Sequence, residues 1–404
     1  MPGMETPGTH PGRIIELDAL RGVAVIGIVW MNVLVFAMPG QSYYNPMAWG
    51  PGIGEASAID RLIWAASFVF VEDKFRTLFA MLFGAGCLIL IERSQSRKWQ
   101  AHFARMAVLF GIGLVHAVLV ASNDVLRAYA LAGLALPLLA HLSARELYAI
   151  AIGLVVLHSG AGLVMFGGAV LDHLNGLTTS DAALFAERNF GRDEAAIRYS
   201  LSIGAEGFSE RVLRRLNSIP QQIVAISGSL PLNLAAMTLG MGLWKQRMLA
   251  GEWRTYLLQR LAAVCALVAI PGLLALVWWT AQSDFSGAVA GASTLLISAP
   301  FDTLLGLAYA ALAMAFFAPG GALTVRLAAV GRLSLTNYLM TSVIFGAIFA
   351  GWGLGLFGSV SRSEAFALSL VPVVAMLLWS PVWLTRFGQG PFERLWRAGA
   401  RLLA

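Results

Sequence analysis

A stretch without any ionisable residue runs as Val23-Ala-Val-Ile-Gly-Ile-Val-Trp-Met-Asn-Val-Leu-Val-Phe-Ala-Met38. It follows directly on a charged decapeptide, Arg13-Ile-Ile-Glu-Leu-Asp-Ala-Leu-Arg-Gly22. An α-helix needs about 20 predominantly apolar residues to cross a bilayer, and this run approaches that length. The decapeptide therefore lies at the mouth of a predicted membrane helix, where charged groups are costly unless they pair or face a polar cavity.

Asp18 and Arg21 are spaced three residues apart, so on a helix they are neighbours that can neutralise each other. Two interpretations fit this spacing. One is an ion pair at the start of the helix with arginines anchoring the cytoplasmic side, and the other is a functional site. The residues alone leave both open.

The composition of the whole chain indicates the same environment. Of its 404 residues, 58% are hydrophobic and only 12% are charged, whereas a soluble domain carries about 25% charged residues. Helices and closed barrels alone satisfy the backbone in hydrocarbon, and long apolar runs without alternation favour helices over barrel strands. We therefore predict an all-α integral membrane protein, a polytopic helix bundle.

About ten transmembrane helices are predicted from windows of about 20 apolar residues. The expected spans are 21–39, 72–91, 104–121, 125–142, 147–169, 221–243, 256–279, 291–317, 331–351 and 365–385. With the N-terminus in the cytoplasm, most Lys and Arg residues fall in cytoplasmic segments, so both termini are expected to be cytoplasmic. The segment 56–71 is also apolar and is either an interfacial helix or part of one long helix.

The spans divide the chain into four parts. We expect a flexible N-terminal tail over 1–12, an N-terminal membrane half over 13–170, an extracytoplasmic polar loop over 171–220 and a C-terminal membrane half over 221–404, ending in a short cytoplasmic tail. The polar loop has charged clusters with apolar residues at helical spacing between them, which is typical of amphipathic helices on a membrane surface.

The net charge of +6 follows this topology, because Lys and Arg lie in short segments between apolar runs. Nucleic acid is therefore not an expected partner. The sequence contains no phosphate-binding loop, no dinucleotide fingerprint, no nucleophile elbow and no histidine pair at metal spacing. We expect no metal site and no tightly bound cofactor.

His116 lies well inside an apolar run and is followed closely by Asp124. A histidine titrates near neutral pH and can accept a proton from an acceptor hydroxyl or amine. The connection between the third and fourth spans is short, so Asp124 is expected across a tight turn, where it would orient the imidazole. The alternative is a histidine that is satisfied by a backbone carbonyl.

Asn32 and the segment Glu72-Asp-Lys-Phe-Arg76 are two further polar features within apolar surroundings. Asn32 lies about three helical turns beyond Arg21, so both project to one side of the first helix. An asparagine in a span usually makes an interhelical hydrogen bond. The charged segment precedes glycines at 84 and 86 that allow close approach of a helix or ligand, and it is either a solvated helix start or a ligand site.

Polar side chains gather at the start of the ninth span in Gly331-Arg-Leu-Ser-Leu-Thr-Asn-Tyr338. At membrane depth they must face protein or a polar cavity. The unpaired N–H groups of a helix N-terminus here, next to Arg332, Thr336 and Asn337, suit a phosphate. Asp302 in the eighth span is expected to find its partner here or at the first span.

Five motifs together resemble the YeiB-like bacterial membrane proteins, whose C-terminal half is the domain of unknown function 418. They are Arg13-x3-Leu17-Asp-x-Leu-Arg-Gly22, Leu78-Phe-Ala-Met-Leu-Phe-Gly-Ala-Gly86, His116 with Asp124 and Ala128-Tyr129, Gly331-Arg-x-Ser-Leu-Thr-Asn-Tyr338, and Gly390-Pro-Phe-Glu-Arg-Leu-Trp-Arg397. The resemblance runs in the family's order from Arg13 to about Arg397. It implies a multi-pass protein of the bacterial cytoplasmic (inner) membrane.

The resemblance also implies an activity, because the family is grouped with the transmembrane acyltransferase superfamily. A better-understood member of that superfamily moves an acetyl group from cytosolic acetyl-CoA to a sugar amine across the membrane. Its functional histidine follows an asparagine resembling Asn32, whereas the matching stretch Gln41–Pro46 contains no histidine. Either His116 takes that role here or the chemistry differs.

The leading hypothesis is acyl transfer from cytoplasmic acyl-CoA, a co-substrate, to an acceptor in the membrane or at its outer face. His116 would be the general base, oriented by Asp124, with Asn32 holding a carbonyl or acceptor group. The donor would be held by Arg13, Asp18, Arg21, Arg332, Thr336 and Asn337.

Membrane lipids and a small-molecule acceptor are the expected partners, and a homodimer is compatible with the sequence. The alternative function is a transporter or exporter of a small hydrophobic or peptide-like metabolite, in which the buried charges form a substrate or proton pathway. A non-catalytic membrane scaffold is a third hypothesis.

Overall fold

The structure is a computed structural model that describes residues 14–50, 52–93, 98–318 and 320–404. Over these residues all regular structure is helical. The first half contains α1 (Ile15–Ala37), α2 (Gln41–Tyr44), α3 (Ala58–Phe70), α4 (Lys74–Arg93), α5 (Lys98–Leu119), α6 (Val125–Gly133), α7 (Leu136–Leu139) and α8 (Ala144–Leu174). The middle contains α9 (Asp181–Phe190), α10 (Glu194–Gly204), α11 (Phe208–Asn217), α12 (Ile219–Lys245) and α13 (Thr255–Gln282). The remainder contains α14 (Gly287–Ala292), the π-helix η1 (Ser293–Ile297), α15 (Ala299–Phe316), α16 (Ala322–Arg332), α17 (Ser334–Phe349), α18 (Arg362–Leu368), α19 (Leu370–Phe387) and α20 (Pro391–Leu403).

Within the described residues, 8 helical segments are long and apolar enough to cross a membrane, judged by length and composition. They are Ile15–Ala37, Ala58–Glu92, Trp99–Leu119, Ala144–Leu174, Ile219–Lys245, Thr255–Gln282, Ala299–Phe316 and Arg362–Phe387. The predicted class, an all-helical polytopic membrane protein, is confirmed. The expected spans 125–142 and 331–351 hold the shorter helices α6, α7 and α17, so the count of ten stays a prediction.

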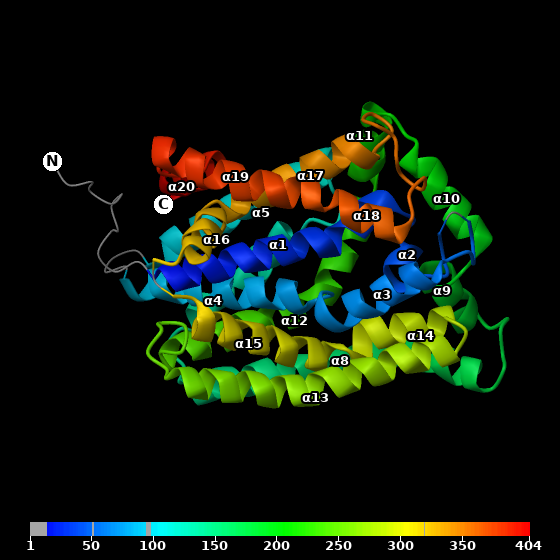
Figure 1. The fold of residues 1–404 in the computed structure, drawn as a ribbon, viewed down its shortest axis with the longest axis horizontal. Helices are drawn as coiled ribbons and strands as arrows, with labels where there is room; N and C mark the ends of the chain where they lie inside the picture. The colour runs from blue at the N-terminus through cyan, green and yellow to red at the C-terminus, as the bar shows by residue number, and fades with distance from the viewer. Residues whose placement is uncertain (1–13, 51, 94–97, 319) are drawn as a thin grey trace.

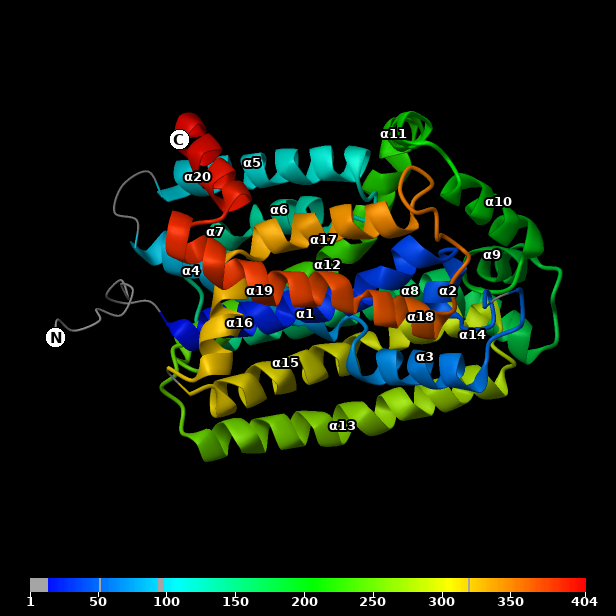
Figure 2. The same ribbon diagram turned by 45° about the horizontal axis from the view of Figure 1, so that its top comes forward.

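The long helices run side by side along the long axis of the molecule (Figure 1). We call the end where α1 begins and α20 ends the near end, and the opposite end, with α2, α9 and α10, the far end (Figure 2). The predicted polar loop supplies the short helices α9, α10 and α11 at the far end. The charge distribution predicts that the near end faces the cytoplasm, and this orientation stays a prediction.

Two apolar stretches are broken into shorter helices, and we call them the broken crossings. The 35-residue apolar segment Ala58–Glu92 is interrupted between α3 and α4 by a turn in which Asp73 adopts a φ of 58°. The apolar segment 56–71 therefore forms a separate helix, α3, and the turn joins it to α4 within one long apolar stretch. The next broken crossing passes from α14 through η1 into α15. The turn at Asp73 contains neither glycine nor proline, so the sequence carries no conventional signal for it.

Glycines set the closest contacts between helices. A Cβ on Gly331 of α16 would lie 1.9 Å from the backbone oxygen of Asp18 in α1, and Gly22 of α1 faces α16 in the same way. Gly84 of α4 and Gly240 of α12 form a second backbone-to-backbone contact. Such contacts let helices associate through close van der Waals packing in lipid, where the hydrophobic effect does not drive them together.

Candidate active site

A cavity of about 900 Å³ extends from the near end into the bundle, between α1, α4, α5, α6, α16, α17 and α20. Its near-end walls carry Arg21, Arg105, Arg332, Arg394, Arg397 and Arg401, together with the carboxylates of Asp18 and Glu393. The guanidinium group of an arginine matches the geometry of a phosphate group and can donate two parallel hydrogen bonds to its oxygens. This part of the cavity is therefore suited to an anionic group.

The cavity becomes apolar with depth. On α1 its wall passes from Arg21 to Ile28, and on α4 from Leu90 to Phe79. The deeper wall consists mainly of aliphatic and aromatic side chains: Val25, Ile28, Phe79, Phe83, Leu109, Leu126 and Tyr129. The deep end is reached at Val125 and Tyr338. A molecule with an anionic head and an apolar tail matches this change along the cavity.

Next to the deep end, His116 and Asp124 form a hydrogen-bonded pair. Nδ1 of His116 lies 2.7 Å from Oδ2 of Asp124, and the residues are only 5% and 3% exposed. Because an ionised carboxylate only accepts hydrogen bonds, a neutral imidazole in this pair carries its proton on Nδ1 and has its lone pair on Nε2. Nε2 is buried and has no hydrogen-bond partner among the described residues. This is the arrangement that a general base requires.

Asp124 is held in place by the start of α6. It caps that helix, because the N–H of Arg127 donates to Oδ1 of Asp124 at 3.1 Å. The Arg127 guanidinium is buried and donates to Gln222 Oε1 at 2.8 Å. A Cβ on Gly113 of α5 would lie 2.6 Å from Oδ1 of Asp124, so glycine provides the space for the carboxylate.

Tyr338 links the pair to the cavity. Its hydroxyl donates a long hydrogen bond of 3.5 Å to Oδ2 of Asp124 and accepts one of 3.3 Å from the N–H of Val125. Its ring centroid lies 5.5 Å from that of His116. Tyr338 and Val125 both line the deep end. The sequence placed Tyr338 at the start of a span but gave it no role beside His116.

Two of the predicted donor-binding arginines line the cavity. Arg21 pairs with Asp18 at 2.9 Å, as their spacing predicts. Arg332 donates to the backbone oxygen of Gly388 at 3.2 Å. Arg13 lies outside the described residues.

Five predicted site residues do not line the cavity: His116 and Asp124, which lie next to its deep end, and Thr336, Asn337 and Asn32. The N–H and hydroxyl of Thr336 both donate to Glu393 of α20, at 3.1 and 2.5 Å, so this carboxylate occupies the helix N-terminus that the sequence offered to a phosphate. The amide oxygen of Asn337 accepts from Trp379 Nε1 at 2.9 Å. Asn32 lies in the second half of α1, away from the cavity-lining residues.

The arginines of α20 were missed as site residues. Arg394, Arg397 and Arg401 recur at helical spacing along a strongly amphipathic helix, which was the available signal. Helix α20 lies against the first turns of α5 (Figure 2), where the Arg105 guanidinium sits 4.6 Å from the Trp396 ring. Trp396 Nε1 also donates to the backbone oxygen of Arg105 at 2.8 Å.

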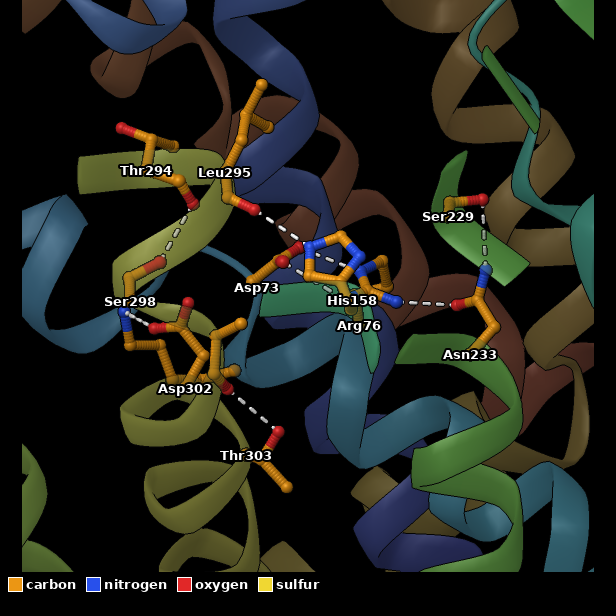
Figure 3. A network of polar contacts seen from close by, with 12 residues as sticks. Asp73, Arg76, His158, Ser229, Asn233, Thr294, Leu295, Ser298, Asp302 and Thr303 are labelled. Carbon is orange, nitrogen blue, oxygen red and sulfur yellow. Dashed lines mark hydrogen bonds and ion pairs between the residues drawn. The ribbon is translucent and has the colours of Figure 1, made fainter. Parts of the chain in front are cut away.

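A second polar cluster lies where the two broken crossings meet (Figure 3). Lys74 Nζ lies 2.6 Å from Asp302 Oδ1, and both side chains are almost completely buried. The expectation that Asp302 finds its partner at the first or ninth span is wrong, because that partner belongs to α4. Arg76 binds Asp73 through two hydrogen bonds of 2.7 and 3.0 Å and Asn233 through one of 2.5 Å. The charged segment therefore forms a network of ion pairs and hydrogen bonds, in which Lys74 is buried while Asp73 and Arg76 are partly exposed.

The second cluster also touches the cavity. Tyr129, which lines the cavity wall, donates its hydroxyl to the backbone oxygen of Arg76 at 2.9 Å. Tyr129 is fully buried, so this contact is shielded from solvent. One cavity thus adjoins two polar clusters, each through a tyrosine.

These features define a polytopic helical membrane protein with a deep cavity, and the comparisons identify its family. The family model described as "Protein of unknown function (DUF418)" matches residues 243–402. The chain is 32% identical over 399 residues to "Uncharacterized protein YeiB" of Escherichia coli (strain K12), covering 95% of each chain. It is 28% identical over 414 residues to "Uncharacterized protein YxaH" of Bacillus subtilis (strain 168), covering 96% of this chain and 94% of that one. The chain belongs to the YeiB-like DUF418 family. No solved structure matches it.

Proposed function

We propose that this protein is a membrane-embedded acyltransferase that moves an acyl group from cytoplasmic acyl-CoA to an acceptor presented in the membrane or at its outer face. The observation that carries the proposal is the cavity whose deep end is formed by Tyr338 and Val125. These residues adjoin the His116–Asp124 pair, in which Nε2 of His116 is available as a base.

The shape and charge of the cavity support an acyl-CoA as donor. Six arginine and two acidic side chains among the described residues line it, which leaves an excess of positively charged side chains. Acyl-CoA carries several negative charges on its phosphates and an acyl group at the opposite end. Arg21, Arg332 and the arginines of α20 would bind the phosphates, while the acyl group would extend along the apolar wall towards Tyr338.

The reaction assigned to His116 is general-base catalysis. Nε2 takes the proton from the acceptor hydroxyl or amine as its oxygen or nitrogen attacks the thioester carbon. The bond from carbon to the acceptor forms, the carbon–sulfur bond breaks, and the electron pair leaves with sulfur. The proton on Nε2 then passes to the thiolate, so that free CoA is released. Asp124 stabilises the imidazolium that exists between these steps.

The proposal is tested with the purified full chain in lipid nanodiscs, labelled acyl-CoA and an extract of membrane lipids and sugars as acceptor. In His116→Ala, transfer should fall by about 100-fold or more, while saturable donor binding persists. His141→Ala is the matched control, because His141 is exposed at the near end and should transfer at the wild-type rate. Transfer by His116→Ala at the wild-type rate would contradict the assigned role.

Transport is the second candidate function, and the cluster at the α3–α4 break is the observation that favours it. Ionisable groups at membrane depth mark substrate or proton pathways, and transporters place such groups at broken helices. Flux of a small metabolite in proteoliposomes without acyl-CoA would favour transport. Covalent modification of an acceptor that depends on acyl-CoA would favour transfer.

A further inference from the structure

The turn between α3 and α4 is a stable feature of the fold and not a frayed helix end. Asp73 adopts a left-handed φ of 58°, which is unusual for a residue other than glycine. Two backbone oxygens that the turn leaves without helical partners are satisfied from outside α3. Lys74 Nζ donates to the backbone oxygen of Phe68, and the hydroxyl of Tyr309 donates to that of Phe70 at 2.7 Å. Such strained positions persist where the surroundings hold them, often at functional sites.

The charges at this turn do not balance within the cluster. Lys74 is paired with Asp302, and Arg76 is paired with Asp73. Glu72 is the carboxyl group that remains, and it makes no ion pair among the described residues. Its Oε1 is buried and has no hydrogen-bond partner in that part of the chain. Glu72 as a whole is partly exposed, but a negative charge on a buried oxygen without a partner is unfavourable, and a neutral carboxyl group reduces that cost.

Glu72 faces a narrow cleft that is lined on its other sides by Trp30, Tyr43, Trp64, Ser67, Arg362 and Phe366. The cleft has a volume of about 10 Å³, which is close to the minimum that holds one water molecule. Arg362 enters the cleft from α18, is 2% exposed and donates to the backbone oxygen of Ser42.

The other charged or titratable groups near Glu72 lie on its own segment and on three neighbouring elements. They are Asp73 and Lys74 on its own segment, Asp302 on α15, Arg362 on α18, and Tyr43 and Tyr44 on α2. Lys74 is already held by Asp302 and by a backbone oxygen. Arg362 is therefore the cation through which the cleft can compensate a charge on Glu72.

We propose that Glu72 is a proton-exchange site of the membrane interior, which carries a proton in this structure and releases it to water in the cleft with Arg362 as the compensating cation. In the exchange the O–H bond of the carboxyl group breaks, the electron pair stays on the carboxylate and the proton passes to water. The ionised form needs Arg362 closer than its present contact with Ser42, so proton release is linked to movement of α18 or of the turn.

The position of Glu72 next to α4 gives this exchange a consequence in the cavity. The turn continues directly into α4, whose residues Phe79 and Phe83 line the cavity. A change at the turn can therefore reach the cavity through one rigid helix. This inference goes beyond the proposed acyl transfer and does not depend on it.

The test is infrared difference spectroscopy on the purified full chain in nanodiscs, before and after an alkaline step. The wild type should lose a protonated-carboxyl band, and Glu72→Gln should lack that change. Glu364→Gln, which alters an exposed glutamate of α18, should retain it. In Arg362→Gln the band should persist after the step, because the compensating cation is gone. An unchanged difference band in Glu72→Gln overturns the proposal.

Folding of the variants provides an independent check. Glutamine has the shape and neutrality of protonated glutamate, so Glu72→Gln should elute as a single folded species with the wild-type thermal midpoint. If Glu72→Gln aggregates while Glu72→Asp folds, the carboxylate charge is needed in the folded state, and the proposal is overturned. These outcomes do not require acyl-CoA or acceptor, so they are separate from the test of His116.

Discussion

Replacing Gly331 by alanine tests whether the contact between α1 and α16 organises the near end of the cavity. The new Cβ would lie 1.9 Å from the backbone oxygen of Asp18 and 2.7 Å from the backbone nitrogen of Gly22, whereas ordinary contacts begin at 3.4 Å. The two helices must therefore separate by about 1.5 Å at this point. Overpacking costs about 1–3 kcal/mol where side chains can yield. Here the obstacle is backbone, so we expect the upper end of that range.

Helix propensity opposes this loss but is too small to cancel it. Glycine to alanine within a helix gains about 1 kcal/mol, which leaves a net destabilisation of about 2 kcal/mol. The matched control is Gly153→Ala in α8, where a Cβ would meet nothing within 4 Å. That variant should be at least as stable as the wild type.

Thermal unfolding in detergent, followed with a thiol-reactive dye on the buried Cys87 and Cys265, measures both variants. Gly331→Ala should unfold at a clearly lower temperature, and it should also bind acyl-CoA less tightly because Arg332 and Arg21 flank the contact. If Gly331→Ala unfolds at the same temperature as Gly153→Ala, the backbone contact does not hold the two helices as argued.

Three further substitutions test the polar clusters. Lys74→Met should lower the unfolding free energy by about 3–5 kcal/mol, because it leaves Asp302 buried without its cation. Adding Asp302→Asn should recover part of that loss. The thermal midpoints of the single and double variants measure both effects, and an unchanged midpoint of Lys74→Met would contradict the argument. Asp124→Asn should reduce acyl transfer by about 100-fold or more, because the imidazole of His116 loses the carboxylate that fixes its tautomer. Donor binding should persist, and both transfer and binding are measured on the same sample. Tyr338→Phe keeps the ring but removes the long hydrogen bond of 3.5 Å to Asp124. A net loss of about 0.5–1.5 kcal/mol should lower transfer by about 2- to 10-fold, and an unchanged rate would show that the hydroxyl does not support Asp124.

The helical membrane class was predictable because hydrocarbon imposes a simple length and composition rule. The start of the first helix was less accessible. The expected span begins at 21, whereas α1 begins at Ile15 and contains Asp18 and Arg21 within its first turns. A hydropathy window excludes such charges, but their mutual pairing allows the helix to include them.

The His116–Asp124 pair could be anticipated because both residues lie on either side of one short connection. The Lys74–Asp302 pair could not, because its members are far apart in sequence and the contact depends on how α4 packs against α15. The same limit applies to Thr336, whose apparent phosphate site is filled by Glu393 from α20. Local patterns predict helices and short-range pairs, whereas the partner of a buried charge is decided by tertiary packing.

The two tyrosines of the cavity give the two candidate functions a common physical basis. Tyr338 connects the cavity to Asp124, and Tyr129 connects it to the backbone of Arg76. Both tyrosines line the same cavity, so a molecule that fills it can reach both rings. Acyl transfer would use the first connection, since His116 offers a base whose Nε2 has no partner among the described residues. Transport would use the second, since the charges at the broken helix lie there. A molecule bound in the cavity can thus affect both polar clusters. Binding of a donor alone therefore does not distinguish acyl transfer from transport. The two are distinguished by whether the acyl group of the donor is covalently transferred to an acceptor.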